Sequence, residues 1–150
     1  MTVLTSLMKR VHRQMPAPLR AAPLVLAMEA LRRADWLEAP AALDGRTFSL
    51  TVEDVALEIR FHCANGRFLP GPFDGRETDL TLRAGALSYL RLIGGHADTD
   101  TLFFQRKLSI RGDTALGLEV KYWLDAAPRP DWLGSVAQRL ALLFPEPRAT

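Results

Sequence analysis

Residues 98–121 constrain the fold most, because three secondary-structure elements must fit into this short stretch with almost no loop between them. Asp98 or Thr99 can cap a short helix to residue 105, residues 107–111 form a strand, and Asp113 can cap a second helix to about residue 125. Apolar side chains far outnumber catalytic groups here, so we expect the segment to line an apolar interior. Its apolar residues are Leu102, Phe103, Phe104, Leu108, Ile110, Leu116, Leu118 and Val120.

Alternating residues predict a group of strands in the middle of the chain. Apolar and polar residues alternate over 47–52 and again over 55–62, so a turn at Glu53-Asp54 would make them an antiparallel hairpin. Asn65-Gly66 marks a tight turn into a short strand over 67–69, and a further strand contains Leu80 and Leu82. Strands joined in this way favour an α+β fold, with a mainly antiparallel sheet covered on one face by helices.

Helical spacing predicts the segments that cover this sheet. One helix is expected over about 23–38, with Pro23 in its first turn, and another over 84–93, with Leu87 and Leu90 inward. A last helix is expected over 131–144. We therefore divide the chain into an N-terminal helical segment, residues 1–40, and a domain over residues 41–145.

The first helix, over residues 2–15, is basic and amphipathic. Its apolar residues recur at helical spacing, while Lys9, Arg10 and Arg13 fall mainly away from that stripe. Two interpretations remain open. The helix can pack on its own domain, or it can contact an anionic membrane surface or a partner protein.

No arrangement typical of catalysis or metal binding is visible. The three histidines lie far apart in different elements, and the HADTD run at 96–100 is explained by helix capping and solvation. Cys63, the single cysteine, has no evident base and is expected to be a small apolar residue that is buried or half-buried. Asp113 and Asp125 are interpreted as helix-end residues rather than an acid–base pair. We therefore expect no enzyme, no metal and no cofactor.

Charge and hydropathy exclude two further classes of protein. The net charge of +2 is too small to indicate a nucleic-acid partner. No segment approaches the roughly 20 apolar residues of a membrane span, and the N-terminus lacks the pattern of a signal peptide. We expect a cytoplasmic protein whose contact with the inner membrane, if any, is peripheral.

Several short runs resemble the sterol carrier protein type-2 (SCP-2) lipid-binding superfamily. These runs are LDGR at 43–46, TDLTL at 78–82 leading into a helix, and the Gly112-Asp113 pair after a short strand. The resemblance covers about residues 43–127. Within the superfamily, residues 98–126 closely resemble the UbiT family of bacterial ubiquinone biosynthesis accessory factors, most specifically over 101–106 and 112–117.

The resemblance implies a fold and a role. It implies an SCP-2-like sheet of about five strands with extra N-terminal helices, and a non-catalytic lipid-binding role in oxygen-independent ubiquinone biosynthesis. The ligand would be a polyprenylated intermediate, ubiquinone itself or a membrane phospholipid. The partners would be UbiU, UbiV and ring-modifying enzymes.

One alternative is a membrane-surface adaptor that docks these enzymes without a lipid cavity. A hydrolase or transferase with an apolar substrate is disfavoured by the missing nucleophile and base.

The lipid pocket is expected between the sheet and the helices that cover it. Lys9, Arg10 and Arg13 are candidates for contact with anionic headgroups. If the helices cover the other face of the sheet, the alternate residues of the same strands would line the pocket instead. The candidate lining residues are Leu50, Val52, Leu57, Ile59, Phe61, Leu87, Leu90, Leu102, Phe103, Phe104, Leu116, Val120, Trp123 and Leu124.

Overall fold

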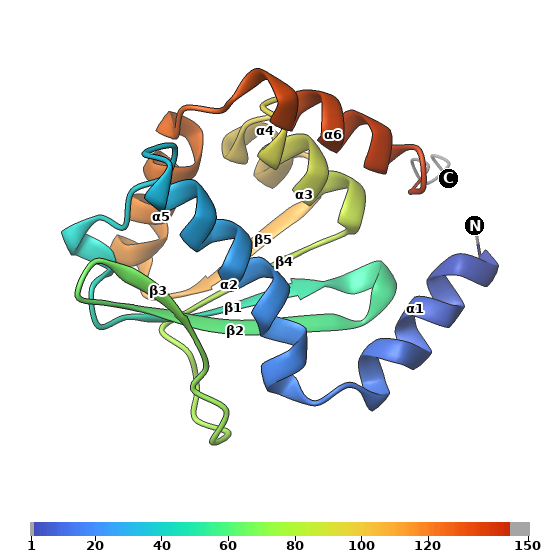
Figure 1. Ribbon diagram of the computed structural model, residues 1–150, viewed down its shortest axis with the longest axis horizontal. Coiled ribbons are helices and arrows are strands. Elements are labelled where there is room, and N and C mark those ends of the chain that lie inside the picture. The colour runs from blue at the N-terminus through green and yellow to red at the C-terminus, as the bar shows by residue number, and fades with distance from the viewer. Residues whose placement is uncertain (1, 145–150) are drawn as a thin grey trace.

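Five short strands form the central sheet of the computed structural model, which describes residues 2–144 (Figure 1). They are β1 (Thr47–Val52), β2 (Leu57–Ala64), β3 (Arg67–Pro70), β4 (Leu80–Ala84) and β5 (Leu108–Gly112). The order across the sheet is β3-β2-β1-β4-β5. The pairs β1–β2, β2–β3 and β4–β5 are antiparallel, and β1–β4 is parallel. This confirms the α+β, mainly antiparallel architecture.

The strand register gathers the apolar side chains on one face of the sheet. Phe48 pairs with Phe61 of β2 and with Leu80 of β4, and Leu50 pairs with Ile59. Because successive side chains of a strand point to opposite faces, paired residues share a face. That face is therefore apolar, whereas residues such as Arg60, on the other parity, lie on the opposite face.

Helices cover the apolar face, and Figure 1 shows them on one side of the sheet. Figure 1 also shows α1 beyond the β1–β2 end of the sheet. There, a 3-10 turn, η2 (Glu53–Val55), joins β1 to β2 and contacts α1. Helix α2 packs on β2 and β3, α4 and α5 pack on β5, and α6 packs on α3. The helices are α1 (Thr2–Gln14), α2 (Ala17–Arg33), α3 (Ala86–Ile93), α4 (Thr99–Phe104), α5 (Thr114–Ala126) and α6 (Asp131–Ala141).

Helix α2 corrects the helix expected over residues 23–38. It begins at Ala17 and ends at Arg33, so Pro23 lies inside the helix, and a different proline, Pro18, takes the first turn. The physical reason is burial. Ala21, Val25 and Met28 recur at helical spacing and all pack inward, so the apolar stripe starts before Pro23. Trp36 then lies outside the helix and is exposed.

Three smaller boundaries also differ from the sequence-based expectation. Val55 lies in η2 rather than in the second strand, and Ala84 ends β4 rather than opening a helix. The next helix, α3, starts after Gly85, where Asp54 Oδ1 accepts a hydrogen bond from the Ala86 N–H at 2.9 Å. The last helix, α6, ends at Ala141 rather than at Phe144.

The Gly112-Asp113 pair joins the sheet edge to α5. Gly112 has a φ of +121°, and a Cβ there would lie 2.2 Å from the carbonyl oxygen of Asp79. The Asp113 N–H donates to that same oxygen at 3.0 Å, and Asp113 Oδ1 accepts from the Leu116 N–H to cap α5. Glycine is therefore required sterically, and the expected cap at Asp113 is confirmed.

Candidate functional site

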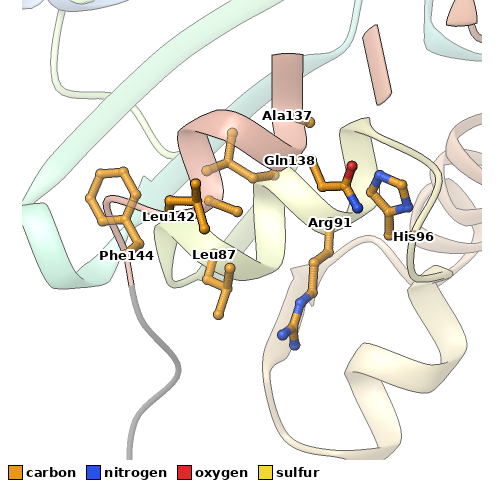
Figure 2. Close-up of a pocket in the computed structure, with 9 residues that line it drawn as sticks. Leu87, Arg91, His96, Ala137, Gln138, Leu142 and Phe144 are labelled. Carbon is orange, nitrogen blue, oxygen red and sulfur yellow. The ribbon is translucent and has the colours of Figure 1, made fainter. Parts of the chain in front are cut away.

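The candidate site is an apolar pocket of about 400 Å³ between α3 and α6. Figure 2 shows Leu142 and Phe144 at one end of it, with the side chains of Gln138 and His96 at the other. Its volume lies within the range of small-molecule sites, toward the lower end. The lining residues are Leu87, Leu90, Arg91, His96, Ala137, Gln138, Ala141, Leu142 and Phe144.

Two glycines bring α3 and α6 close together at one end of this pocket. A Cβ at Gly94 would lie 2.9 Å from the Cβ of Ala137, and a Cβ at Gly134 would lie 3.3 Å from the Gly94 carbonyl oxygen. The two backbones therefore almost touch where both residues are small. The pocket lies beside this contact, where the lining residues include larger side chains such as Leu87 and Phe144.

The pocket combines a long apolar wall with a few polar groups. Arg91, His96 and Gln138 are its polar lining residues, and His96 Nε2 lies 3.4 Å from the Gly134 carbonyl oxygen. Sites of this kind take amphiphilic molecules, because the apolar wall holds a tail while the polar groups orient a head. This arrangement can bind, but it has no nucleophile paired with a base.

Two of the predicted pocket residues, Leu87 and Leu90, line this pocket. The five strand candidates share the sheet face that the helices cover, as their register requires. Ile59 and Phe61 are buried there, and the other three are half-buried. Candidates placed in the core or packed against it are Leu50, Phe61, Leu102, Leu116, Val120, Trp123 and Leu124, and Val52 and Leu57 are half-buried on the same strands.

Aromatic side chains pack between the sheet and α5. The rings of Phe48 and Phe61 stack at 5.1 Å between centroids, and Phe68 stacks on Trp123 at 5.7 Å. The indole N–H of Trp123 donates to the Glu38 carbonyl oxygen at 2.8 Å, which ties α5 to the segment after α2. These contacts account for the burial of the predicted residues in this region.

Two candidates from α4, Phe103 and Phe104, lie at the surface. Phe103 is 46% exposed and Phe104 is 79% exposed. Phe103 borders a groove of about 180 Å³ between β5 and α5, and the ammonium group of Lys121 lies 5.7 Å from its ring centre. Both rings are separated from the α3–α6 pocket.

Helix α1 presents an apolar stripe to solvent. Val3, Leu7 and Val11 are exposed, and His12, on another face, places Nδ1 3.0 Å from the Val55 carbonyl oxygen. Among the predicted headgroup contacts, Arg10 and Arg13 are exposed and Lys9 is half-buried. Arg10 lines a groove of about 340 Å³ together with Val3, Ser6 and Leu7. The helix therefore carries basic and apolar residues on its exposed surface.

The groups considered for chemistry have structural roles. Cys63 is 1% exposed, and burial raises the pKa of its thiol to about 12. Asp125 accepts hydrogen bonds from the backbone N–H and the hydroxyl of Thr99 at 3.0 and 2.7 Å, so it holds the start of α4.

Among residues 2–144, no group of three or more His, Cys, Asp or Glu side chains is placed to hold a metal ion. The helices within residues 2–144 include none with the length and hydropathy of a membrane span.

Sequence reasoning missed the whole α6 side of the pocket. It placed the pocket between the sheet and the helices that cover it, and so omitted Ala137, Gln138, Ala141, Leu142 and Phe144. It also omitted Arg91 of α3 and His96, which follows that helix. One signal was present, because Gly94 and Gly134 together with Ala137 are the small residues that a close helix–helix contact needs. Nothing local in the sequence shows that these positions face each other.

Comparison with known proteins identifies what the chain is similar to. Residues 28–125 match the model of the SCP-2 sterol transfer family. The chain is 39% identical over 84 residues to the ubiquinone biosynthesis accessory factor UbiT of Escherichia coli strain K12, covering 56% of this chain and 47% of that relative. The match thus spans less than half the length of the relative.

Solved structures share the fold at low sequence identity. A protein described as "UbiJ-SCP2 Ubiquinone synthesis protein" superposes with a TM-score of 0.51 at 15% identity, over 77% of this chain and 96% of that one. Palmitated SCP2L2 from Aedes aegypti superposes with a TM-score of 0.52 at 15% identity, over 71% of this chain and 95% of the other. These likenesses concern the fold alone.

Proposed function

The chain belongs to the SCP-2 sterol transfer family, and from that membership we propose that it is a non-catalytic, lipid-binding accessory factor of ubiquinone biosynthesis. The 39% identity to UbiT over 84 residues supports the pathway. The structural roles of Cys63, Asp113 and Asp125 support a binding role rather than catalysis.

The proposed ligand is a polyprenylated ring intermediate, ubiquinone or a membrane phospholipid. The observation that carries this proposal is the α3–α6 pocket, apolar along Leu87, Leu90 and Leu142 and polar at His96 and Gln138. Transfer of apolar surface out of water is favourable by about 25 cal/mol per Å². A protein that covers an isoprenoid tail can therefore keep an otherwise insoluble substrate available to enzymes outside the membrane.

We place this role in the cytoplasm and in the oxygen-independent route. UbiU, UbiV and ring-modifying enzymes are the proposed partners, since the UbiT resemblance implies that route. The proposal keeps the sequence-based division at residue 40, although α2 contributes Val25 and Met28 to the common core.

Helix α1 is the proposed contact with the membrane. Lys9, Arg10 and Arg13 can approach anionic headgroups while the exposed stripe of Val3, Leu7 and Val11 enters the interface. This pairing of basic and apolar residues supports peripheral contact at the inner membrane. It equally favours the second candidate function, an adaptor that docks biosynthetic enzymes at the membrane surface without taking up lipid.

Native mass spectrometry with lipid extraction tests the proposal. We expect the purified protein to carry an isoprenoid quinone, a polyprenylated intermediate or a phospholipid. Leu87→Trp should fill the α3–α6 pocket and abolish this mass, whereas Leu26→Trp, at a 68% exposed position on α2, should leave it unchanged. A wild-type protein that carries no lipid and takes up no added ubiquinone analogue would favour the adaptor. Loss of lipid in both variants would contradict the pocket assignment.

A further inference from the structure

A second pocket adjoins the apolar one and shares His96 with it. This polar pocket, also about 400 Å³, lies where the α3–α4 connection and the start of α4 meet the end of α5 and the α5–α6 connection. Because His96 lines both pockets, a molecule with a tail between α3 and α6 can extend its head past the imidazole into the polar pocket. The lining residues are Gly95, His96, Ala97, Asp98, Thr101, Asp125 and Arg129.

The imidazole of His96 is held where the two pockets meet. Its Nε2 lies 3.4 Å from the Gly134 carbonyl oxygen of α6, and its Cδ2 would lie 2.8 Å from a Cβ at Gly94. The ring therefore rests against the end of α3 and the first turns of α6. Because His96 is exposed, its ring can present a face to a ligand without unpacking the core.

Hydrogen-bond acceptors dominate the polar pocket. Asp98 Oδ1 accepts from the Thr101 N–H at 2.7 Å, and the two oxygens of Asp125 each accept once from Thr99. The hydrogen bonds from Thr101 also lower the pKa of Asp98, so its carboxylate stays ionised at neutral pH. A carboxylate has about four lone-pair positions, so both aspartates retain capacity to accept from a ligand.

The cation of this pocket is largely committed to the protein. Arg129 donates through Nε to the Ile93 carbonyl oxygen at 3.0 Å, and through its two terminal nitrogens to Ala127 and Leu124 at 3.3 and 2.9 Å. Three of its five N–H groups thus serve the ends of α3 and α5. With two carboxylates against one guanidinium, the pocket carries a net negative charge.

We propose that the polar pocket binds the head of the amphiphile whose tail lies between α3 and α6, and that this head is a neutral ring bearing hydroxyl donors, a phenol or a quinol. A hydroxyl on such a ring can donate to Asp98. A quinone ring has only carbonyl acceptors, and a phosphate head meets like charge, so both bind less well. This inference rests on the proposed lipid-binding function and names the chemistry of its ligand.

The test compares two forms of one molecule with the same tail. The probes are a short-tailed ubiquinone analogue and its chemically reduced quinol, titrated under argon while the quenching of tryptophan fluorescence is recorded. A hydrogen bond to a charged acceptor contributes enough to favour the quinol by about tenfold. Asp98→Asn, which keeps a good helix cap, should reduce this preference to about twofold. Asp113→Asn is the control, since Asp113 caps α5 in the same way but lies outside both pockets; it also removes the ion pair with Arg46, so its effect on stability is measured alongside.

The outcomes separate this inference from the function on which it rests. Leu87→Trp should weaken the binding of both probes by similar factors, because it blocks the pocket for the tail and not the pocket for the head. Equal binding of quinone and quinol by the wild type, or tighter binding of a short-chain phosphatidic acid, would overturn the inference and leave lipid binding intact. Failure of every probe to bind the wild type would overturn both. A preference lost equally in Asp98→Asn and Asp113→Asn would also refute the assignment to this pocket.

Discussion

Replacing Gly94 with alanine should separate α3 from α6 and destabilise the protein, although its backbone conformation is an ordinary one for alanine. Gly94 caps the end of α3 in a right-handed helical conformation. At a position of this kind, replacing glycine with alanine usually stabilises a protein by about 0.4–1 kcal/mol, because the unfolded chain loses conformational entropy. The neighbours of the new methyl group therefore decide whether the substitution stabilises or destabilises the protein.

The structure places two groups too close to that methyl group. Its carbon would lie 2.9 Å from the Cβ of Ala137 and 2.8 Å from Cδ2 of His96. The imidazole can rotate, but Ala137 is fixed on α6, so the helices must move apart. Overpacking of this kind typically costs about 1–3 kcal/mol. We expect a net loss of about 0.5–2 kcal/mol in the free energy of unfolding.

Urea unfolding with a matched control measures this effect. Gly85→Ala is the control, since the nearest atom to its new Cβ belongs to Asp54 at 3.8 Å, which is an ordinary contact. Gly94→Ala should lower the unfolding midpoint well below that of Gly85→Ala. It should also weaken binding of a ubiquinone analogue, because the lining residues of α3 and α6 change their spacing. A Gly94→Ala variant as stable as the wild type would refute the close contact between the helices.

Three further results are expected. Gly112→Ala should lower the free energy of unfolding in urea by about 3 kcal/mol or more, because of backbone strain and the clash with Asp79. Gly45→Ala, where φ is +74° but the space is open, should lower it by only about 1–2 kcal/mol, and equal losses would contradict the steric argument. Arg129→Met should lower stability by about 2–4 kcal/mol, because three carbonyl oxygens lose a charged donor, and an unchanged thermal midpoint would argue against that role. Cys63, with its pKa raised to about 12, should react with a thiol reagent at pH 8 far more slowly in the folded protein than in urea, and similar rates would show that the thiol is accessible.

The strands and several helix starts were predictable because they depend on nearby residues. Alternation over 47–52 and 55–62 sets the hairpin, and short side chains at Asp98 and Asp113 cap the helices that follow them, at positions the structure confirms. Helix α2 was misplaced because Pro23 was taken as a start signal, whereas the buried stripe that begins at Ala21 overrides this local preference.

Tertiary structure alone explains Asp125. A carboxylate near the end of a helix is mildly unfavourable, and the sequence offers no reason for it. In the fold, this side chain receives two hydrogen bonds from Thr99, which is 26 positions earlier in the chain and fully buried. The partner is close in space but distant in sequence, so no spacing rule could find it.

The sequence by itself determined the apolar sheet face, the order of helices and strands, and the resemblance to a lipid-binding family. Only the tertiary structure decided that β4 enters the sheet parallel to β1, and that a candidate pocket lies between α3 and α6 as well as the core between the sheet and its helices. The physical reason is the range of the interactions. Periodicity and capping act within a few residues, whereas a pocket depends on which helices approach closely, and Gly94 and Ala137 are neighbours in space but distant in sequence.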